Sequence, residues 1–160
     1  MIGLNFFLVF LLIVATAFFV ATEFAIIRVR SSRIDQLVQE EVRGATAAKA
    51  VISNLDGYLS ACQLGITVTS LGLGWLGEPT FEKLIHLLLG DIGLSSEVVS
   101  VLSFLSAFFV ITFLHVVAGE LAPKSIAIQK AEKITLLLSP VITIFYKVMY
   151  PLIWLLNGSA

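Results

Sequence analysis

Charged residues are scarce in this chain. Asp, Glu, Lys and Arg make up 13% of its 160 residues, and the formal net charge is −1, whereas ordinary soluble domains carry about 25% charged residues. The chain also lacks an arginine-rich stripe and a platform of interleaved aromatic side chains, the features that hold nucleic-acid backbones and bases. The composition therefore argues against an ordinary soluble domain and offers nothing to bind a nucleic acid.

Cysteine and histidine are also rare. Cys62 is the only cysteine, which excludes an intrachain disulfide, and His86 and His115 stand apart from it and from each other. Metal sites built from sulfur and nitrogen need several such ligands at short spacing. No nucleophile with a neighbouring base is visible, so we expect no enzymatic activity. Residues 72–77 spell Gly-x-Gly-x-x-Gly, but no strand precedes them, which argues against a dinucleotide-binding loop.

Long apolar runs are what the chain does contain. Hydrophobic residues make up 58% of it, and its mean hydropathy is +1.01. Residues 4–27 carry Glu23 as their only charge, residues 58–76 carry none, and residues 98–121 carry only Glu120. About 20 apolar residues in a helix cross the hydrocarbon core of a bilayer. We therefore predict three transmembrane helices over these ranges.

The first run contains Ala15-Thr16-Ala17, which matches the cleavage pattern of a secretory signal. No Lys or Arg precedes the run, however, and it continues to Ile27, beyond that site. Signal peptides carry a basic leader and end at the cleavage site. We therefore interpret the run as a retained transmembrane helix.

The segments between the runs differ in character. Residues 30–54 are polar and rich in helix formers, which predicts one or two short cytosolic helices broken near Gly44. Residues 77–97 are predicted to form an external loop, with a short amphipathic piece over 81–89 and a turn at Gly90–Gly93.

Residues 133–157 are long enough to span a membrane, but their pattern favours another placement. Polar and aromatic residues recur along one side at three- and four-residue steps, namely Thr135, Ser139, Thr143, Tyr146, Tyr150 and Trp154. Pro140 and Pro151 are expected to bend this helix, and Lys147 would lie well inside a span. Amphipathic helices of this kind lie in the membrane interface. We predict a kinked juxtamembrane belt helix, with a fourth span as the alternative.

The expected fold is therefore an all-α membrane protein with three transmembrane helices, short cytosolic helices and a belt helix. Of the ten Lys and Arg residues, three spans leave only Lys83 on the side opposite the others. Cytoplasmic segments are enriched in Lys and Arg. This predicts a multi-pass protein of the plasma (inner) membrane, with its N-terminus outside and its C-terminus in the cytosol.

Glu120 is the strongest functional candidate, because it follows an uncharged run and precedes Pro123 by three residues. Proline has no backbone N–H, so in a helix Pro123 leaves the carbonyl of Gly119 without its usual donor and is expected to kink the helix. A carboxylate beside such a carbonyl suits a hard cation. An acid at membrane depth costs about 2.5–3.5 kcal/mol on insertion scales, which favours a functional role.

Hydroxyl oxygens on the other two spans extend this candidate ligand set. Thr67 and Ser70 lie on one polar face of the second span, and Thr22 lies near the cytosolic end of the first. Oxygen ligands suit Mg²⁺, Ca²⁺ or Na⁺ rather than transition metals. Two alternatives stay open: Glu120 pairs with Lys124 four residues later, or the hydroxyls bond to their own helices.

Three segments resemble the transmembrane domain of the CorC/cyclin-M (CNNM) magnesium transporters. They are Phe18–Ala25, Gln63–Thr67 and Gly119–Lys124, the last reading Gly-Glu-Leu-Ala-Pro-Lys. The resemblance extends over the whole chain. It implies three spanning helices, a belt-like juxtamembrane helix, a homodimer in the lipid bilayer, and export of Mg²⁺ driven by Na⁺.

Carried over to this chain, the resemblance implies an ion site made by Thr22, Glu120 and polar positions of the second helix. The chain departs from the family there, because it has Ile66, Thr67 and Ser70 where many members have asparagines. The expected metal ligands are therefore Glu120, Gly119, Thr22, Thr67 and Ser70, with Glu23, Gln63 and Lys124 next to them. For Glu23 the alternative is an ion pair with Arg28 or Arg30.

Two other functions stay open: a Na⁺ transporter, or a non-transporting dimeric anchor for cytosolic regulatory domains. Members of the family usually continue into a pair of cytosolic CBS domains that bind adenine nucleotide. The sequence stops at Ala160, so we expect a truncated membrane domain. ATP binding is then expected only in the missing cytosolic part.

Overall fold

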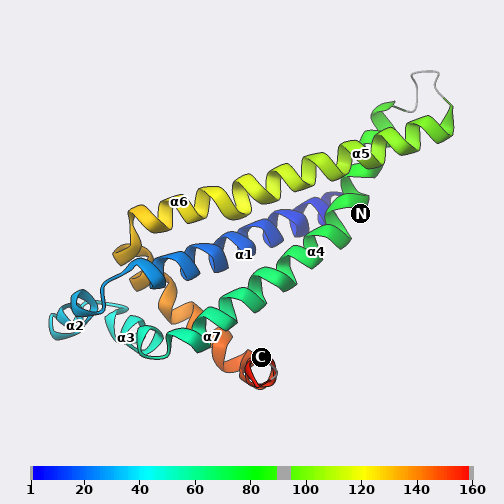
Figure 1. The fold of residues 1–160 in the computed structure, drawn as a ribbon. Helices are drawn as coiled ribbons and strands as arrows, with labels where there is room; N and C mark the ends of the chain where they lie inside the picture. The colour runs from blue at the N-terminus through cyan, green and yellow to red at the C-terminus, as the bar shows by residue number, and fades with distance from the viewer. Residues whose placement is uncertain (1, 90–94, 159–160) are drawn as a thin grey trace.

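The computed structural model describes residues 2–89 and 95–158, and every regular element within them is a helix. The turn expected at Gly90–Gly93 lies outside the described residues. The elements are α1 (Ile2–Arg28), α2 (Ser31–Gln39), α3 (Ala45–Ser53), α4 (Leu55–Leu89), α5 (Ser96–Leu114), the π-helical turn η1 (His115–Leu121), α6 (Ala122–Gln129) and α7 (Ala131–Asn157). Figure 1 shows three long rods side by side, formed by α1, by α4, and by α5 continued through η1 into α6.

Small residues bring α1 and α4 together along their lengths. A methyl group added at Gly65 would lie 2.5 Å from the ring of Phe19, and one at Gly72 would lie 3.3 Å from Leu12. Close approach at glycine is the usual way in which apolar helices pack when both neighbours are equally apolar. The contact between the two helices therefore rests on close packing rather than on ion pairs.

The third rod packs on the same pair of helices. Val9, Leu73 and Ile111 form one buried cluster that draws on all three rods. Gly77 lies against Ile111, where an added methyl group would approach the side chain to 2.8 Å. Halfway along α1, Gly119 is buried beside Thr16. The three rods thus share one core that runs along the bundle.

Two helix ends differ from the sequence expectation. The second span does not stop at residue 76, because residues 77–89 of the expected loop continue α4 through Pro79. The Thr80 hydroxyl donates to the Leu76 carbonyl at 2.6 Å, and Phe81 packs edge-on against Phe6 at 5.2 Å between ring centroids. These contacts support the turn in which proline has removed a backbone donor. The prediction of a loop at 77–89 was therefore wrong.

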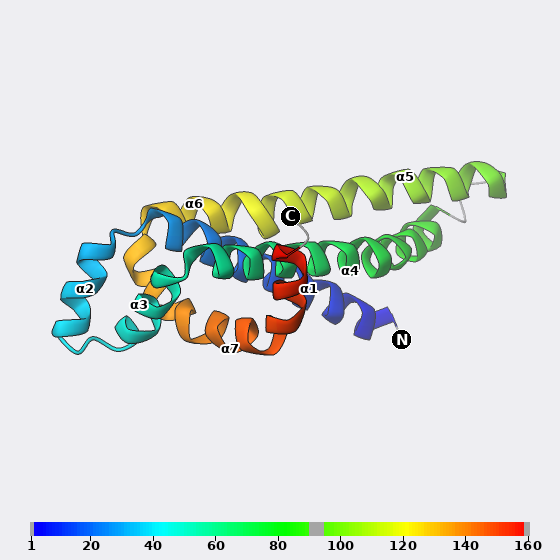
Figure 2. The same ribbon diagram turned by 60° about the horizontal axis from the view of Figure 1, so that its bottom comes forward.

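The third span likewise continues past residue 121. It passes through Pro123 into α6 and ends at Gln129. Figures 1 and 2 show α5, η1 and α6 following one another as a single rod. The expected kink at Pro123 is therefore replaced by a wider, π-helical turn just before the proline. Widening the turn moves the Gly119 carbonyl off the proline ring, which would collide with it in a regular α-helix.

The short helices α2 and α3 meet at Gly44, where the sequence predicted a break. Gly44 has φ of +86°, and a methyl group there would collide with the carbonyl oxygen of Leu136 in α7. Glycine is the residue that adopts this left-handed conformation without strain. Buried Ile34 and Leu37 complete the contact between the two helices. Arg33 adds an ion pair with Glu132 at 3.1 Å.

Four described helical stretches are long and apolar enough to cross a membrane, and the fourth is residues 131–155 of α7. In Figures 1 and 2, α7 covers only the half of the bundle nearest α2 and α3 and turns near its C-terminal end. The first part of its polar stripe faces the other helices, whereas Tyr150 and Trp154 near its end are exposed. Thr135 and Ser139 are buried, and Tyr146 stacks on Tyr58, because this side packs against α1, α3 and α4.

Candidate cation site in the central polar cluster

The π-helical turn η1 contains the sequence motif that carries Glu120. The N–H of Ala122 donates to the carbonyl of Val117, a bond that spans five residues instead of four. Single π-helical turns inside α-helices occur frequently at functional sites. Here the turn ends two residues before Pro123, so the proline and the wide turn form one local defect in the rod.

The turn lies halfway along α1. A methyl group added at Gly119 would lie 3.1 Å from the His115 ring and 3.5 Å from Thr16. Thr16 is about 18 Å from Arg28 along the helix, at 1.5 Å per residue. Gly119 is buried at this contact, so the absence of a side chain lets α1 approach the turn closely.

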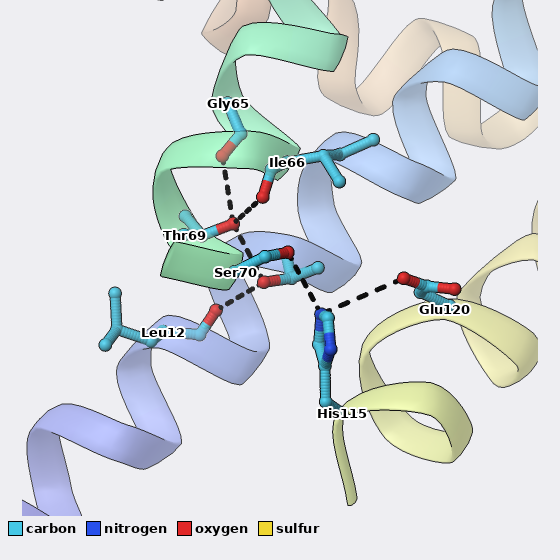
Figure 3. Close-up of polar contacts among 8 residues, drawn as sticks. Leu12, Gly65, Ile66, Thr69, Ser70, His115 and Glu120 are labelled. Atoms are coloured by element: carbon cyan, nitrogen blue, oxygen red, sulfur yellow. Dashed lines mark hydrogen bonds and ion pairs between the residues drawn. The ribbon is translucent and has the colours of Figure 1, made fainter. Parts of the chain in front are cut away.

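Ser70, His115 and Glu120 come together at this level, as Figure 3 shows. The Ser70 hydroxyl oxygen lies 3.2 Å from Nε2 of His115, and the same nitrogen lies 3.9 Å from a Glu120 carboxylate oxygen. The side chain of His115 is 19% exposed and that of Glu120 is 45% exposed. The carboxylate is therefore held beside a polar pair and still has an open side.

A second pair of hydroxyls lies next to this cluster. Thr16 Oγ1 is 2.8 Å from Thr69 Oγ1 and 2.9 Å from the Leu12 carbonyl oxygen. Thr69 donates to the Gly65 carbonyl at 2.9 Å. Both threonines are buried, and the contact joins α1 to α4 at the level of Gly119. This pair is part of the helix interface rather than of the open side of Glu120.

The two other expected hydroxyl ligands bond to their own helices. Thr22 is fully buried and donates to the Phe18 carbonyl at 2.7 Å. Thr67 is exposed and donates to the Gln63 carbonyl at 2.9 Å. Within the described residues, no hydrogen bond connects either threonine to Glu120. A hydroxyl that donates its proton in this way keeps lone pairs with which it can accept a bond or bind a cation.

Glu23, Gln63 and Lys124 form a separate cluster closer to Arg28. The Glu23 carboxylate bonds to the Gln63 side chain and is attracted by the Lys124 ammonium. The Lys124 ammonium lies 4.3 Å from the centroid of the Phe24 ring. Among the described residues, the Glu120–Lys124 ion pair that the sequence left open does not form.

Comparison with known proteins identifies the family of this chain. The profile of the cyclin M transmembrane N-terminal domain (CNNM) matches residues 7–160. The chain belongs to this family. The resemblance seen in the three sequence motifs is thereby confirmed.

Relatives of this CNNM domain occur in distant bacteria. The UPF0053 protein YrkA of Bacillus subtilis (strain 168) is 59% identical over the whole chain, which covers 37% of that protein. YhdT of the same organism is 59% identical over 96% of the chain and 33% of its own length. Rv1841c of Mycobacterium tuberculosis (strain H37Rv) is 35% identical over 96% of the chain and 43% of its own length. The chain spans about a third of the length of the Bacillus relatives it matches.

In the CNNM domain, sequence reasoning did not place His115 beside Ser70 and Glu120, where the structure puts it. His115 and Glu120 are five residues apart, a spacing that separates two side chains on an α-helix but brings them to one side of a π-helical turn. Thr16 and Thr69 were missed because each lies within an ordinary apolar pattern.

The described residues contain no cluster of three His, Cys, Asp or Glu side chains suited to a metal. A cation beside Glu120 would therefore take most of its ligands from hydroxyl and carbonyl oxygens and from water. Such a donor set suits hard cations such as Mg²⁺ and Na⁺ and is poor for zinc.

Proposed function

We propose that this domain binds Mg²⁺ beside Glu120 and exports it from the cell, coupled to Na⁺. The observation that carries the proposal is a carboxylate in a π-helical turn, halfway along the bundle, with an open side and a hydroxyl–imidazole pair next to it. Burying an acid at membrane depth costs about 2.5–3.5 kcal/mol on insertion scales. A bound cation would offset that cost.

The proposed ligands are the Glu120 carboxylate, the Gly119 carbonyl and the Ser70 hydroxyl, with Thr22 and Thr67 supplying further neutral oxygens. Their own-helix hydrogen bonds orient the threonine protons away from the oxygen lone pairs that would face an ion. Mg²⁺ favours six oxygen ligands and gives up its water reluctantly. The proposed ion therefore keeps part of its hydration shell.

In the proposed arrangement, α1, α4 and the rod from α5 to α6 span the membrane, and α7 is a belt in the cytosolic leaflet. The location of α7 against only half of the bundle supports this arrangement. Thr135 and Ser139 of α7 face the bundle, and Leu137, Ile144 and Val148 are exposed, a face suited to lipid tails. A fourth span remains the alternative for α7.

The basic residues support an orientation with the α2–α3 end in the cytosol. Arg28, Arg30 and Arg33 follow α1 there, and α6 carries Lys124 toward the same end. Cytosolic flanks of transmembrane helices are rich in such residues. The N-terminus of α1 would then face the outside.

A homodimer is also part of the proposal. The outer faces of the three rods expose large apolar side chains, including Trp75 at 85% and Leu71 at 70% exposure. Three helices enclose little space, so the open side of Glu120 would be completed by a second copy or by water. Lipid contacts cover the remaining apolar surface.

Calorimetric titration of the purified domain with Mg²⁺ tests the proposal, with wild type beside Glu120→Gln and with Ca²⁺ and Na⁺ as comparison ions. Glu97→Gln is the matched control, because it removes an exposed acid from the start of α5. We expect saturable Mg²⁺ binding in wild type and Glu97→Gln and a loss of binding in Glu120→Gln. Unchanged affinity in Glu120→Gln would overturn the proposal.

The competing function is a membrane anchor without transport, which the own-helix bonds of Thr22 and Thr67 favour. An anchor has no need of water beside α4. Thr67→Cys and Ser70→Cys separate the two functions through labelling with a charged, membrane-impermeant thiol reagent. Labelling at both positions supports an aqueous ion pathway, and protection at both supports the anchor.

A further inference from the structure

The polar face of α4 extends beyond the central cluster. Because α4 continues past residue 76, Glu78 joins the series Gln63, Thr67, Ser70 and Gly74 at three- and four-residue steps. Residues at these steps share one side of a helix. Gln63 meets Glu23 at one end, and Ser70 meets His115 in the middle. The series therefore forms one polar stripe with an acid near each end.

A cavity lies on this stripe between α4 and α5. Its volume is about 110 Å³, and its polar lining comes from Ser70, Glu78, Thr112 and His115. Leu73 and Phe108 supply apolar walls. One water needs about 10–15 Å³ of such space and two to four polar partners. The cavity is thus large and polar enough to hold several waters or a partly hydrated ion.

Among the described residues, Glu78 is the only acid that lines this cavity, and no basic side chain pairs with it. In the part of the chain that the structure describes, no ion pair or hydrogen bond of its side chain is present, and Lys83 does not pair with it. Glu78 follows Gly77, which packs against Ile111 at the level of Val9. Val9 and Arg28 are about 28 Å apart along α1, at 1.5 Å per residue. Glu78 therefore lies about one bilayer thickness from the Arg28 end.

We propose that this cavity is a second, outer cation site, in which Glu78 is the counter-charge to a partly hydrated Na⁺ or Mg²⁺. Ser70 and retained water supply neutral oxygens, and Thr112 lines the wall of the cavity beside them. His115 forms the wall between this site and Glu120, since its Nε2 atom faces Ser70 and Glu120. The role of the site as the outer station of a transport path rests on the proposed function. Its ability to bind a cation does not.

The cavity predicts a difference in accessibility between two exposed positions on α5. Thr112 lines the cavity, whereas Phe109 is 70% exposed on the outer surface of the rod and is absent from the cavity lining. In a Cys62→Ala background, we expect a charged thiol reagent to label Thr112→Cys in the membrane-embedded domain and to leave Phe109→Cys unlabelled. Absence of labelling at Thr112→Cys in a folded protein would show a dry cavity and overturn the proposal.

The decisive measurement is whether a bound cation protects Thr112→Cys from the thiol reagent. We expect Na⁺ or Mg²⁺ to slow labelling of Thr112→Cys, and Glu78→Gln to raise the ion concentration needed for half-protection by about tenfold. Glu82→Gln, one turn further along α4, is the matched control and should leave protection unchanged. The proposal would be overturned if neither ion slowed the labelling, or if Glu78→Gln left the half-protecting ion concentration unchanged.

Glu120→Gln distinguishes this proposal from the proposed function. Protection at Thr112→Cys should persist in that variant, because the outer cavity has its own carboxylate. Loss of calorimetric Mg²⁺ binding with retained protection would support both sites. Loss of protection in Glu120→Gln would show that the cavity has no independent affinity, and would contradict the outer site alone. Helical circular dichroism and elution as a single species confirm that each variant has folded.

Discussion

Two acid–proline pairs lie in two neighbouring rods, and the surrounding helix differs between them. Glu78 is followed directly by Pro79, and the helix remains α-helical through the pair. Glu120 precedes Pro123 by three residues, and a π-helical turn has formed around the acid. Glu78 lines a cavity and has no ion-pair partner in the described part of the chain, whereas Glu120 lies beside His115.

The difference shows what the position of proline does to a nearby acid. At Pro79, the Thr80 hydroxyl and the packing of Phe81 stabilise the interrupted turn. At Pro123, the residue four positions earlier is Gly119, which is buried between the His115 ring and Thr16 of α1. The rod adapts there by widening its turn, which brings two polar residues five positions apart to one side. An acid close to a proline therefore lines a cavity in α4, whereas in the rod from α5 to α6 it lies beside a histidine.

The largest expected effect is the difference in Mg²⁺ affinity between variants that lack one or the other acid. Glu120→Gln should weaken Mg²⁺ binding by about a hundredfold or more, because it removes the only carboxylate at the central cluster. Glu78→Gln should weaken the calorimetric signal of that central site by less than about threefold, since it lies in the outer cavity. Titration calorimetry on the two variants measures both values. Equal losses would mean that the acids serve one site.

The next effect concerns the space around each acid. Gly119→Ala should lower the free energy of unfolding by about 1–3 kcal/mol, because the added methyl group would lie 3.1 Å from the His115 ring. Gly74→Ala is the matched change on the outer cavity, where nothing lies within 4 Å. It should leave stability unchanged or raise it by up to about 1 kcal/mol through helix propensity. Thermal unfolding in detergent measures both, and a destabilised Gly74→Ala would contradict an open outer cavity.

A smaller effect is expected at Ser70, the residue that both clusters share. Ser70→Ala removes the hydrogen bond to His115, which is worth about 1 kcal/mol. We expect an approximately fivefold loss of Mg²⁺ affinity, with an accompanying change in the His115 imidazole signals by NMR. Thr67→Ala is the comparison on the same face: Thr67 is a proposed ligand too, but its hydroxyl bonds within α4, so we expect a smaller loss of Mg²⁺ affinity than for Ser70→Ala. A larger loss of Mg²⁺ affinity in Thr67→Ala than in Ser70→Ala would show that Thr67, and not Ser70, lies nearer to the bound ion.

The smallest effect is expected for a charge pair outside both clusters. Glu132 accepts a hydrogen bond from Arg33 and thereby raises the pKa of the guanidinium above its ordinary value. A raised pKa stabilises the fold below the unfolded-state pKa, and the contribution is lost only as the pH rises through the folded-state pKa. We expect Arg33→Gln to have little effect on the unfolding temperature and none that varies with pH from neutral to moderately alkaline conditions. The exposure of both side chains implies that solvent screens the pair. A strong pH dependence of the unfolding temperature over this range would contradict that screening.

The polar stripe of α7 illustrates why part of the fold could not be predicted. Periodicity identified the stripe, but not the surface it meets. Thr135 and Ser139 face the other helices, although an isolated amphipathic helix would turn such residues toward water. Tyr146 finds its partner in Tyr58, far away in the sequence. The burial of the stripe depends on where α3 and α4 lie, which no local pattern contains.

The sequence alone determined the helical class, the family and the central regions of the apolar helices, and it singled out Glu120 as a candidate, because these depend on hydrophobicity, length and short motifs. Tertiary structure decided whether proline ends a helix, whether the acid pairs with Lys124 or lies near His115, and whether Glu78 belongs to a loop or to the polar stripe of α4. These outcomes depend on contacts between rods, such as Gly77 on Ile111 and Gly119 on Thr16. Packing energy of this kind outweighs the local preference of a proline when neighbouring helices support the interrupted turn.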